Sequence, residues 1–533
     1  MKAWGGTLIL WERPSEECAF ENPIDCDSDP KYKHIRTYDG SCNNLQHPYW
    51  GKARTPLARF LKSDYDDGTG SPRLLGKDGD ALPNPRDIRL SIHEKSLPIH
   101  ELKNHSHFLM QWGQRTSHDM LLKVESKEDL DCCGEDSGKE NCEIPILVRS
   151  DDPYYSQYKR TCLNFRRSKA SADLKCTFGT RQQLSNVTSF IDASDLYGSN
   201  DVTNANLRTK VDGDFRANQH PALMSLQTIL FREHNHIARK LKFQNPEWND
   251  EKLFQESRRI VIAEIQHITF SSFLPNILGS KIMNLFDLYP RPIEEYFTGY
   301  DDRVIPTSRN SFMAAAFRFG HSLVNDHLAF KDCAGNKERT LFRHLWGNPD
   351  KLYEANGIEK TLRGLQEEHS QSVDRYKSEE MIRFFESPDQ AGTDVISMNI
   401  NRGRDHGIAG YMEWRKMCKL STADQFSSLT DHTPEMVKLL QSQYRHPSDI
   451  DLFVGGVTET PLPEALVGPT FACIIGLQFK ALKYGDRFYY ENSHPEVRLT
   501  ITQLKEIKKT TLAGVVCRNT NIGEIQKDVF SHG

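Results

Sequence analysis

Apolar residues spaced for the faces of helices are the feature that most constrains the fold of this chain. Within 221–243 they recur at intervals of three, four and seven residues, which places on one helix face Leu223, Leu226, Leu230, Ile237 and Leu241. The stretch 251–270 repeats this pattern, and 311–324 is apolar almost all round, as expected for a buried helix. Alternation typical of strands is scarce. The sequence therefore predicts a mainly α fold, with long loops and little β structure.

Length, charge and hydropathy narrow the class of protein further. The 533 residues carry a net charge of −5, so no basic excess points to a nucleic-acid partner. No apolar run approaches the roughly 20 residues that span a bilayer, and no signal peptide is visible. We therefore predict one large domain over 1–533, with roughly the first 25 residues as a peripheral extension.

Cysteine usage indicates the compartment. The chain has 12 cysteines, several of them in two polar, turn-rich clusters at 18–42 and 132–162. No CxxC pair is present, so a zinc ribbon or a thioredoxin motif is not expected. An even number of cysteines in such loops is typical of disulfides and of a secreted protein, although reduced cysteines in a cytosolic protein remain the alternative.

Two of the candidate sites each lie within a few consecutive residues of the sequence. Gln114 and His118 are four residues apart, so on a helix their side chains would share one face, while that of Asp119 would point elsewhere. Taken alone, such a histidine is more often a packing residue. In the segment 188–194 every second side chain shares one side of an extended loop, so that its oxygens could bind Ca²⁺, although a plain turn is the simpler interpretation.

Two other candidates place charge beside a histidine. Arg318 precedes His321 by three residues in an apolar segment, where both side chains need partners; a haem would supply them, although a histidine bonded to a backbone carbonyl is the simpler reading. The segment 401–407, NRGRDHG, is predicted as a polar loop in which Asp405 could accept a hydrogen bond from a buried imidazole. An exposed salt bridge in that loop is the alternative.

Together and in this order, these segments resemble the animal haem peroxidase superfamily, which includes myeloperoxidase, lactoperoxidase and peroxidasin. The resemblance runs from about Tyr32 to Asn521. Single motifs are weak, but their order is very specific: RTYDGSCNN (36–44), QWGQRTSHDM (111–120), TSFIDASDLYGS (188–199), LFREHNHIARKL (230–241), AAFRFGHSLV (315–324), NRGRDHGIAGY (401–411), DLFVGG (451–456), GPTFACIIGLQF (468–479) and GDRFYYEN (485–492).

The resemblance implies a catalytic set. His118 matches the distal histidine, which moves a proton between the two oxygens of the peroxide. Arg216 matches the distal arginine, which stabilises the negative charge that develops, and Gln114 matches the glutamine beside the peroxide and halide site. His118 must be neutral to act as a base, so the resemblance implies that activity falls when acid protonates it.

The resemblance also implies the cofactor and metal ligands. His321 matches the proximal ligand of the haem iron, Arg318 the partner of a haem propionate, and Asp405 the position that hydrogen-bonds the proximal histidine. The calcium ligands of the family match Asp119, Thr188, Phe190, Asp192 and Ser194. This calcium site would tie the helix of the distal histidine to a separate loop.

Disulfides are a further implication of the resemblance. It pairs Cys26 with Cys42, Cys132 with Cys142, Cys133 with Cys162 and Cys418 with Cys473. It gives no partner to Cys18, Cys176, Cys333 and Cys517.

The chain departs from the family at the two positions that often form ester bonds with the haem. Ser117 stands where the family has an Asp before the distal histidine, and Gln219 stands where it has a Glu after the distal arginine. His220 replaces the haem-linked Met of myeloperoxidase. Neither Ser117 nor Gln219 has a carboxylate, so the sequence predicts a haem b that is held without covalent bonds.

The function that the resemblance implies is that of a secreted haem peroxidase. Such an enzyme reduces hydrogen peroxide and oxidises small reductants through a high-valent haem intermediate. The expected reductants are phenols, with halides as a second class. One alternative is a non-catalytic or weakly active adhesion or matrix protein that retains the fold. A fatty-acid dioxygenase is less favoured, because such enzymes place a radical-forming Tyr where Arg318 stands.

Overall fold

The computed structural model describes residues 24–28, 31–95, 97–125, 129–171, 179–207, 214–381 and 391–532. Helices dominate this part of the chain and confirm the predicted fold class. Their bounds are α1 (Lys31–His34), α2 (Pro85–Ile92), α3 (His107–Met120), α4 (Ser194–Tyr197), α5 (Asp201–Leu207), α6 (Pro221–Gln244), α7 (Asp250–Ile268), α8 (Leu274–Leu285), α9 (Asn310–Ala314), α10 (Asp350–Tyr353), α11 (Gly357–Glu367), α12 (Val395–Asp405), α13 (Tyr411–Met417), α14 (Pro434–Gln443), α15 (Leu452–Val457), α16 (Pro469–Gly485), α17 (Ile501–Ile507) and α18 (Leu512–Asn519).

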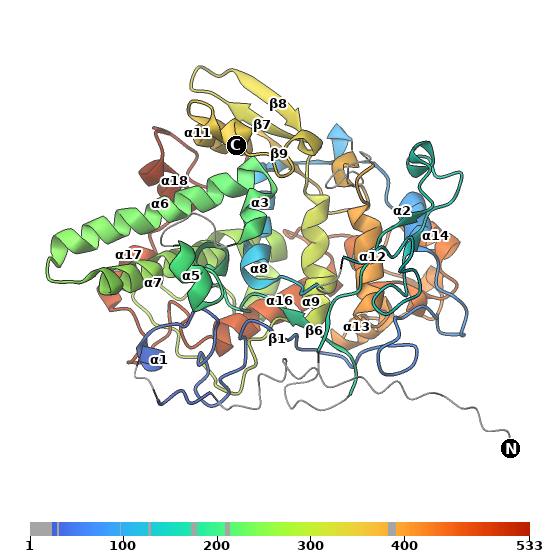
Figure 1. The fold of residues 1–533 in the computed structure, drawn as a ribbon, viewed down its shortest axis with the longest axis horizontal. Helices are drawn as coiled ribbons and strands as arrows, with labels where there is room; N and C mark the ends of the chain where they lie inside the picture. Colours follow the sequence, from blue (N-terminus) through green and yellow to red (C-terminus); the bar gives the residue numbers. More distant parts are fainter. Residues whose placement is uncertain are drawn as a thin grey trace.

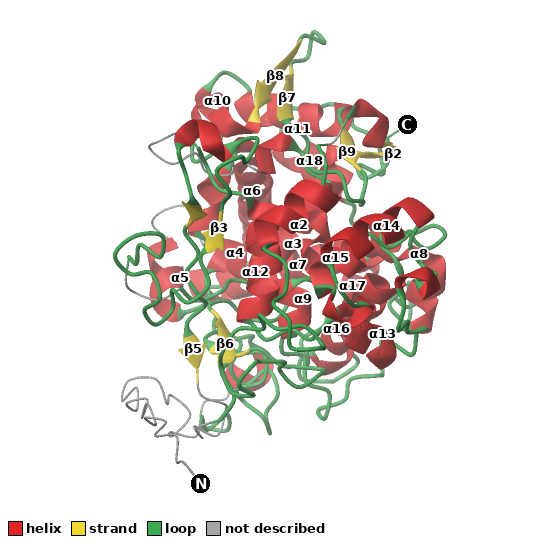
Figure 2. Ribbon diagram, turned by 90° about the vertical axis from the view of Figure 1, so that its right-hand side faces the viewer, coloured by secondary structure: helices red, strands yellow, loops and turns green. Residues whose placement is uncertain are grey.

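Short antiparallel strands lie around the helical centre (Figure 2). β1 pairs with β6 and β6 with β5, while β2 pairs with β9, β3 with β4 and β7 with β8. Their bounds are β1 (Thr55–Pro56), β2 (Glu101–Ser106), β3 (Ile146–Leu147), β4 (Cys162–Leu163), β5 (Ala170–Ser171), β6 (Gln182–Ser185), β7 (His327–Lys331), β8 (Lys337–Leu341) and β9 (His369–Gln371).

Helix α3 occupies the middle of the molecule and contacts α6, α11 and the 3-10 turn η5 (Ala316–Ser322) (Figure 1). It begins where the Ser106 hydroxyl accepts a hydrogen bond from the backbone N–H of Phe108, which satisfies one of the free donors of the first turn. It ends at Leu121, whose backbone is extended. Because α3 is fixed at both ends and buried along its length, the side chains in its last turn are held in place.

The two long helices follow the periodicity of the sequence. α6 starts with Pro221 at its first position, and the imidazole of His220 caps it. α7 packs beside α6 as a helical hairpin (Figure 1) and runs on through a single π-helical turn, Thr269–Phe273, into α8. The apolar faces of these helices belong to one buried cluster that draws on residues from Leu57 to Phe530.

The structure corrects two local predictions. The segment 311–324 is not one helix: α9 ends at Ala314, the next residue, Ala315, has a φ of −137° that is not helical, and the chain continues as η5. Apolarity all round predicts burial but not the type of helix, which explains the error. The segment 401–407 is not a loop either, because its first five residues complete α12.

All four predicted disulfides are confirmed: Cys26–Cys42, Cys132–Cys142, Cys133–Cys162 and Cys418–Cys473. In the described part of the chain, Cys333 and Cys517 are exposed and unpaired. Cys18 and Cys176 lie outside the described residues. None of the described helices combines the length and apolarity that crossing a membrane requires.

Candidate active site

A cavity of about 150 Å³ opens beside α3. Its wall is mainly apolar and aromatic, with contributions from Met110, Phe273, Phe317, Phe319, Leu323, Phe342, Trp346 and Met381. Both predicted histidines line it, His118 from the last turn of α3 and His321 from η5. The structure thus brings together two imidazoles that lie about two hundred residues apart in sequence, as a haem between them requires.

His118 has the properties of a neutral base. Its side chain is buried and lines the cavity, and its Nδ1 has no hydrogen-bond partner among the described residues. Burial, followed by the positive charge of Arg216, lowers the pKa of His118 well below its ordinary value. The imidazole is therefore uncharged at neutral pH and free to accept a proton.

His321 is paired with an amide, not with the predicted carboxylate. Asn399, in α12, places its Nδ2 2.7 Å from Nδ1 of His321, while its Oδ1 accepts a hydrogen bond from Arg318. Arg318 also donates to the backbone oxygen of Met313 and has no carboxylate partner among the described residues. Burial lowers the pKa of Arg318 to about 9, because no carboxylate of the described residues compensates the charge of this guanidinium beside His321.

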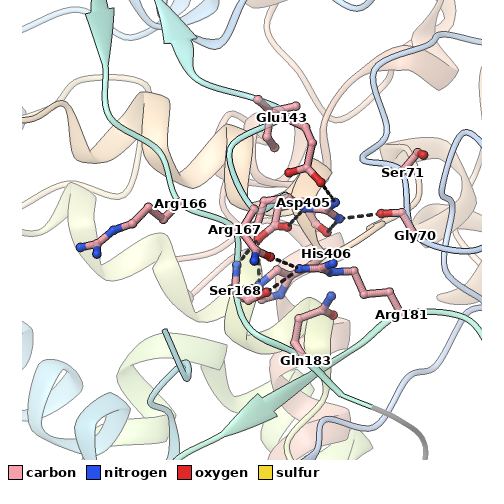
Figure 3. Close-up of polar contacts among 12 residues, drawn as sticks. Gly70, Ser71, Glu143, Arg166, Arg167, Ser168, Arg181, Gln183, Asp405 and His406 are labelled. Carbon is pink, nitrogen blue, oxygen red and sulfur yellow. Dashed lines mark hydrogen bonds and ion pairs between the residues drawn. The ribbon is translucent and has the colours of Figure 1, made fainter. Parts of the chain in front are cut away.

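The prediction that Asp405 hydrogen-bonds the proximal histidine is therefore wrong. Figure 3 shows Asp405 inside a buried network, where one carboxylate oxygen accepts from Arg167 at 2.7 Å. The other oxygen accepts from the backbone N–H of Ser168 at 2.9 Å and from Arg402 at 2.7 Å. The reason is placement: Asp405 lies at the end of α12, next to the segment 166–168, whereas Asn399 lies six residues earlier.

This network joins α12 to loops that are far from it in sequence. Arg167 also donates to the backbone oxygen of Gly70, and Arg181 donates to that of Ser168 (Figure 3). Burial opposes ionisation of Asp405, but Arg402, His406 and Arg167 hold the pKa of this carboxyl well below its ordinary value. The carboxylate is thus ionised and structural, and the alternative of an exposed salt bridge in this segment is also wrong.

The family resemblance places Arg216 beside the peroxide as the distal arginine, but in the structure its side chain does not face the cavity. Its Nη2 donates to the backbone oxygen of His118 at 2.9 Å and its Nη1 to that of Leu121 at 2.8 Å, while Nε contacts Asp214 at 3.0 Å. The last carbonyls of a helix lack intrahelical donors and favour a cation, which explains this position. Arg216 can therefore influence His118 through its charge, but it is not among the described residues that line the cavity.

Gln114 lies in the cavity wall as predicted, and three further polar side chains accompany it. Its Nε2 donates to Oε1 of Gln219 at 2.9 Å, and its Oε1 lies 2.9 Å from Nε2 of His220. Ser117 also lines the cavity. The two positions at which the family carries ester-forming carboxylates thus face the cavity as a hydroxyl and an amide.

The predicted calcium ligands form one buried cluster at the end of α3. The N–H of Ser194 donates to Asp119 at 2.7 Å and to Asp192 at 3.2 Å, and the hydroxyl of Thr188 donates to Asp192 at 2.9 Å. Burial raises the pKa of both carboxyls to about 6. The Phe190 side chain is packed in the core, and no described donor bonds its backbone oxygen.

Sequence reasoning missed Asn399 as the partner of His321. The signal that could have found it is its place within α12, where a buried amide in the first two turns, VISMNIN, needs a polar partner. Among the described residues no group of three His, Cys, Asp or Glu side chains gathers as a metal site, so a calcium ion here would depend on hydroxyl and carbonyl oxygens as well.

Comparisons with known proteins agree with this geometry. A family model described as animal haem peroxidase matches residues 35–214 and 210–530. Peroxidasin homolog pxn-2 of Caenorhabditis elegans is 34% identical, over 95% of this chain and 42% of the relative, and chorion peroxidase of Aedes aegypti is 32% identical, over 94% and 68%. The chain thus spans less than half of the peroxidasin homolog.

Solved structures show the same fold. Peroxidase A from Dictyostelium discoideum superposes with a TM-score of 0.79 at 29% identity, over 93% of this chain and 99% of the other. A fatty acid alpha-dioxygenase of Arabidopsis thaliana has a TM-score of 0.76 at 16% identity, covers 93% of this chain and 83% of its own, and shares the fold alone. The family match over nearly the whole described chain, together with the two histidines on one cavity, identifies this chain as a member of the animal haem peroxidase family.

Proposed function

We propose that the protein is a haem peroxidase that reduces hydrogen peroxide and oxidises small reductants such as phenols. The observation that carries this proposal is that His118 and His321 line one cavity, with the unpaired cation Arg318 on the same turn as His321. The four disulfides support an extracellular, oxidising compartment for this chemistry.

The residues present fit a haem. Nε2 of His321 forms no hydrogen bond with a described residue, and it can be a ligand once the ring proton lies on Nδ1, which requires Asn399 to turn its oxygen to Nδ1 in place of Nδ2. A propionate would then give Arg318, which now donates to that oxygen, the anion that it lacks. When bound, the haem supplies a redox-active iron and a conjugated ring that gives up electrons to the peroxide and takes them from the reductant. Asn399 orients the imidazole of His321 from behind.

His118 carries the proton chemistry. Its neutral Nε2 accepts a proton from one oxygen of hydrogen peroxide and returns it to the other, so that water can leave. Arg216 stabilises the neutral form of His118 by disfavouring a second positive charge. The apolar wall excludes bulk water from this exchange.

The experiment that tests the function is reconstitution with hemin. We expect an intense Soret absorption band and peroxide-dependent oxidation of guaiacol. A protein that takes up hemin but oxidises no guaiacol would instead support the non-catalytic adhesion or matrix alternative.

We predict that the haem is released on denaturation. Because Ser117 and Gln219 supply no carboxylate, acid–acetone is expected to extract all of the haem, and the denatured chain is expected to show its unmodified mass. Mass spectrometry of the intact chain measures this directly. An added mass of one haem on the denatured polypeptide contradicts the prediction.

The pH dependence follows from the lowered pKa of His118. We expect the rate of reaction with peroxide to stay constant as pH falls through 6.5 and to decline only well below it, where His118 binds a proton. Arg216→Gln removes a neighbouring positive charge, so the decline should move up toward pH 6.5. Arg303→Gln, at an 86% exposed side chain, is the matched control and should leave the profile unchanged.

We also propose that Ca²⁺ binds the cluster of Asp119, Asp192, Thr188 and Ser194, together with the backbone oxygen of Phe190. Two carboxylates and neutral oxygens suit this ion. Removal of Ca²⁺ with EGTA is expected to lower the thermal midpoint, and added Ca²⁺ should restore it. Asp192→Asn should abolish this response, and a midpoint that EGTA leaves unchanged in the native chain contradicts the site.

A further inference from the structure

One fully buried lysine has no role in the function proposed above. The side chain of Lys377 has no exposed surface, although lysine is a residue type that proteins almost never bury without an anionic partner. Within the described part of the chain its Nζ donates to two neutral acceptors, the hydroxyl of Ser322 at 2.8 Å and the backbone oxygen of Asp374. A cation buried in this way destabilises the fold, so its use lies outside folding.

The carboxyl that is nearest in sequence does not bind this cation. Asp374 turns its Oδ1 to the backbone N–H of Tyr376 at 2.8 Å, so that only its backbone oxygen accepts from Lys377. Burial lowers the pKa of Lys377 to about 7; the charge of Asp374 opposes this shift, and that of Arg89 adds to it. Below neutral pH, Lys377 therefore carries a positive charge that no described carboxylate pairs with.

The position of Lys377 is fixed at its backbone and at its ammonium group. Its backbone N–H donates to the backbone oxygen of Glu94 at 2.8 Å. Ser322, which accepts from Nζ, is itself fully buried and its hydroxyl lies 3.4 Å from the backbone oxygen of Asp374. Ser322 is the last residue of η5 and follows His321 directly, so the ammonium group is held against the turn that carries this histidine.

The charge acts on the side of the cavity where His321 lies. Burial, then Arg318 and then Lys377 lower the pKa of His321 to about 3. A cation that disfavours a proton on this imidazole also disfavours ferric relative to ferrous iron, because ferric iron carries one more positive charge. A propionate would compensate the charge of Arg318, which leaves Lys377 as the uncompensated cation of the pair.

We propose that Lys377 is a positioning residue that holds one positive charge behind His321 and thereby raises the reduction potential of the haem iron. A site of higher potential takes electrons from poorer donors, so the reductants that depend on Lys377 are electron-poor phenols. The inference rests on the proposed function, since it concerns a haem bound at His321, and it names a class of reductant for that site.

The midpoint potential of the Fe³⁺/Fe²⁺ couple tests the proposal. Spectroelectrochemistry of the hemin-loaded protein is carried out at about pH 5.5, where Lys377 is charged. Lys377→Met replaces the ammonium group with an apolar chain of similar length and should lower the equilibrium constant for reduction about tenfold, which is about 59 mV for one electron. The rate with 4-cyanophenol, relative to that with guaiacol, should fall in the same variant.

A second buried lysine gives the matched control. Lys483 is also fully buried and donates to backbone oxygens, those of Asp287 and Tyr289, each at 2.7 Å. It is not among the charges that shift the pKa of His321, so Lys483→Met should leave the potential unchanged. Ser322→Ala removes the hydrogen bond but keeps the charge, and it should shift the potential less than Lys377→Met does.

A readout without haem separates this role from a structural one. Lys377→Met should raise the denaturant midpoint of the apoprotein, because an apolar side chain replaces an uncompensated buried charge. A lower midpoint together with an unchanged potential would show that Lys377 only supports the fold, which overturns the inference. An equal shift of the potential in Lys483→Met or in Ser322→Ala overturns it as well.

The proposed function and this inference fail in different ways. A chain that takes up no hemin overturns both. A normal Soret band and normal guaiacol oxidation, with a midpoint potential that Lys377→Met leaves unchanged, overturn this inference alone.

Discussion

Replacing His118 with alanine is expected to slow the reaction of the hemin-loaded protein with hydrogen peroxide by about 10²- to 10⁴-fold, the range for loss of a general acid–base group. The variant should still bind haem and show a Soret band, because within the described part of the chain the imidazole of His118 forms no hydrogen bond that holds another cavity residue. Rapid mixing with peroxide under single-turnover conditions measures the rate.

Two further measurements make this result specific to the base. Added imidazole should recover part of the rate in His118→Ala by filling the vacated space. His321→Ala should instead lose the native form of the Soret band, since it removes the proposed ligand. A loss of less than tenfold in His118→Ala would mean that another group moves the proton.

Replacing Asp405 with alanine is expected to lower the free energy of unfolding by about 3–5 kcal/mol, the cost of leaving buried charges without their partner. Arg167 and Arg402 have side-chain exposures of 3% and 4%, so water cannot replace the carboxylate. Denaturant midpoints, together with the slope of the transition, measure the change.

An exposed ion pair gives the matched control. Asp301→Ala breaks a pair with Arg303, whose side chain is 86% exposed, and should cost no more than about 1 kcal/mol. An equal cost for the two variants would show that the network around Asp405 is not structural. Asp405→Asn should also leave the haem spectrum of the folded fraction unchanged, whereas Asn399→Ala should shift it, because Asn399 contacts His321 and Asp405 instead bonds Arg167, Ser168 and Arg402.

The sequence predicted those parts of the fold in which the apolar face of a single helix determines the local structure. α6 follows the leucine pattern, and α3 carries Gln114 and His118 four residues apart into the same cavity. Local spacing was enough there, because burial of one helix face selects the helix. The family resemblance supplied the disulfide pairs, and it matched His118 with the distal and His321 with the proximal histidine of one site.

The errors arose where long-range contacts override local character. NRGRDHG resembles a loop by composition, but its first five residues form the end of a helix, because Arg404 pairs with Asp451 and Asp405 pairs with Arg167 in the interior. In η5 the tighter helix eclipses residues three apart, which keeps Arg318 and His321 on one side of the turn. Periodicity alone does not encode such pairings.

The composition of the cavity wall sets a limit on how long such an enzyme can work. Met110 and Met381 are both part of that wall. Thioethers are converted to sulfoxides by the same oxidant that a peroxidase consumes, and the product is polar and larger. Each catalytic cycle that goes astray would thus degrade the pocket from inside, and Leu at these two positions is the change that would extend the operational lifetime of the protein.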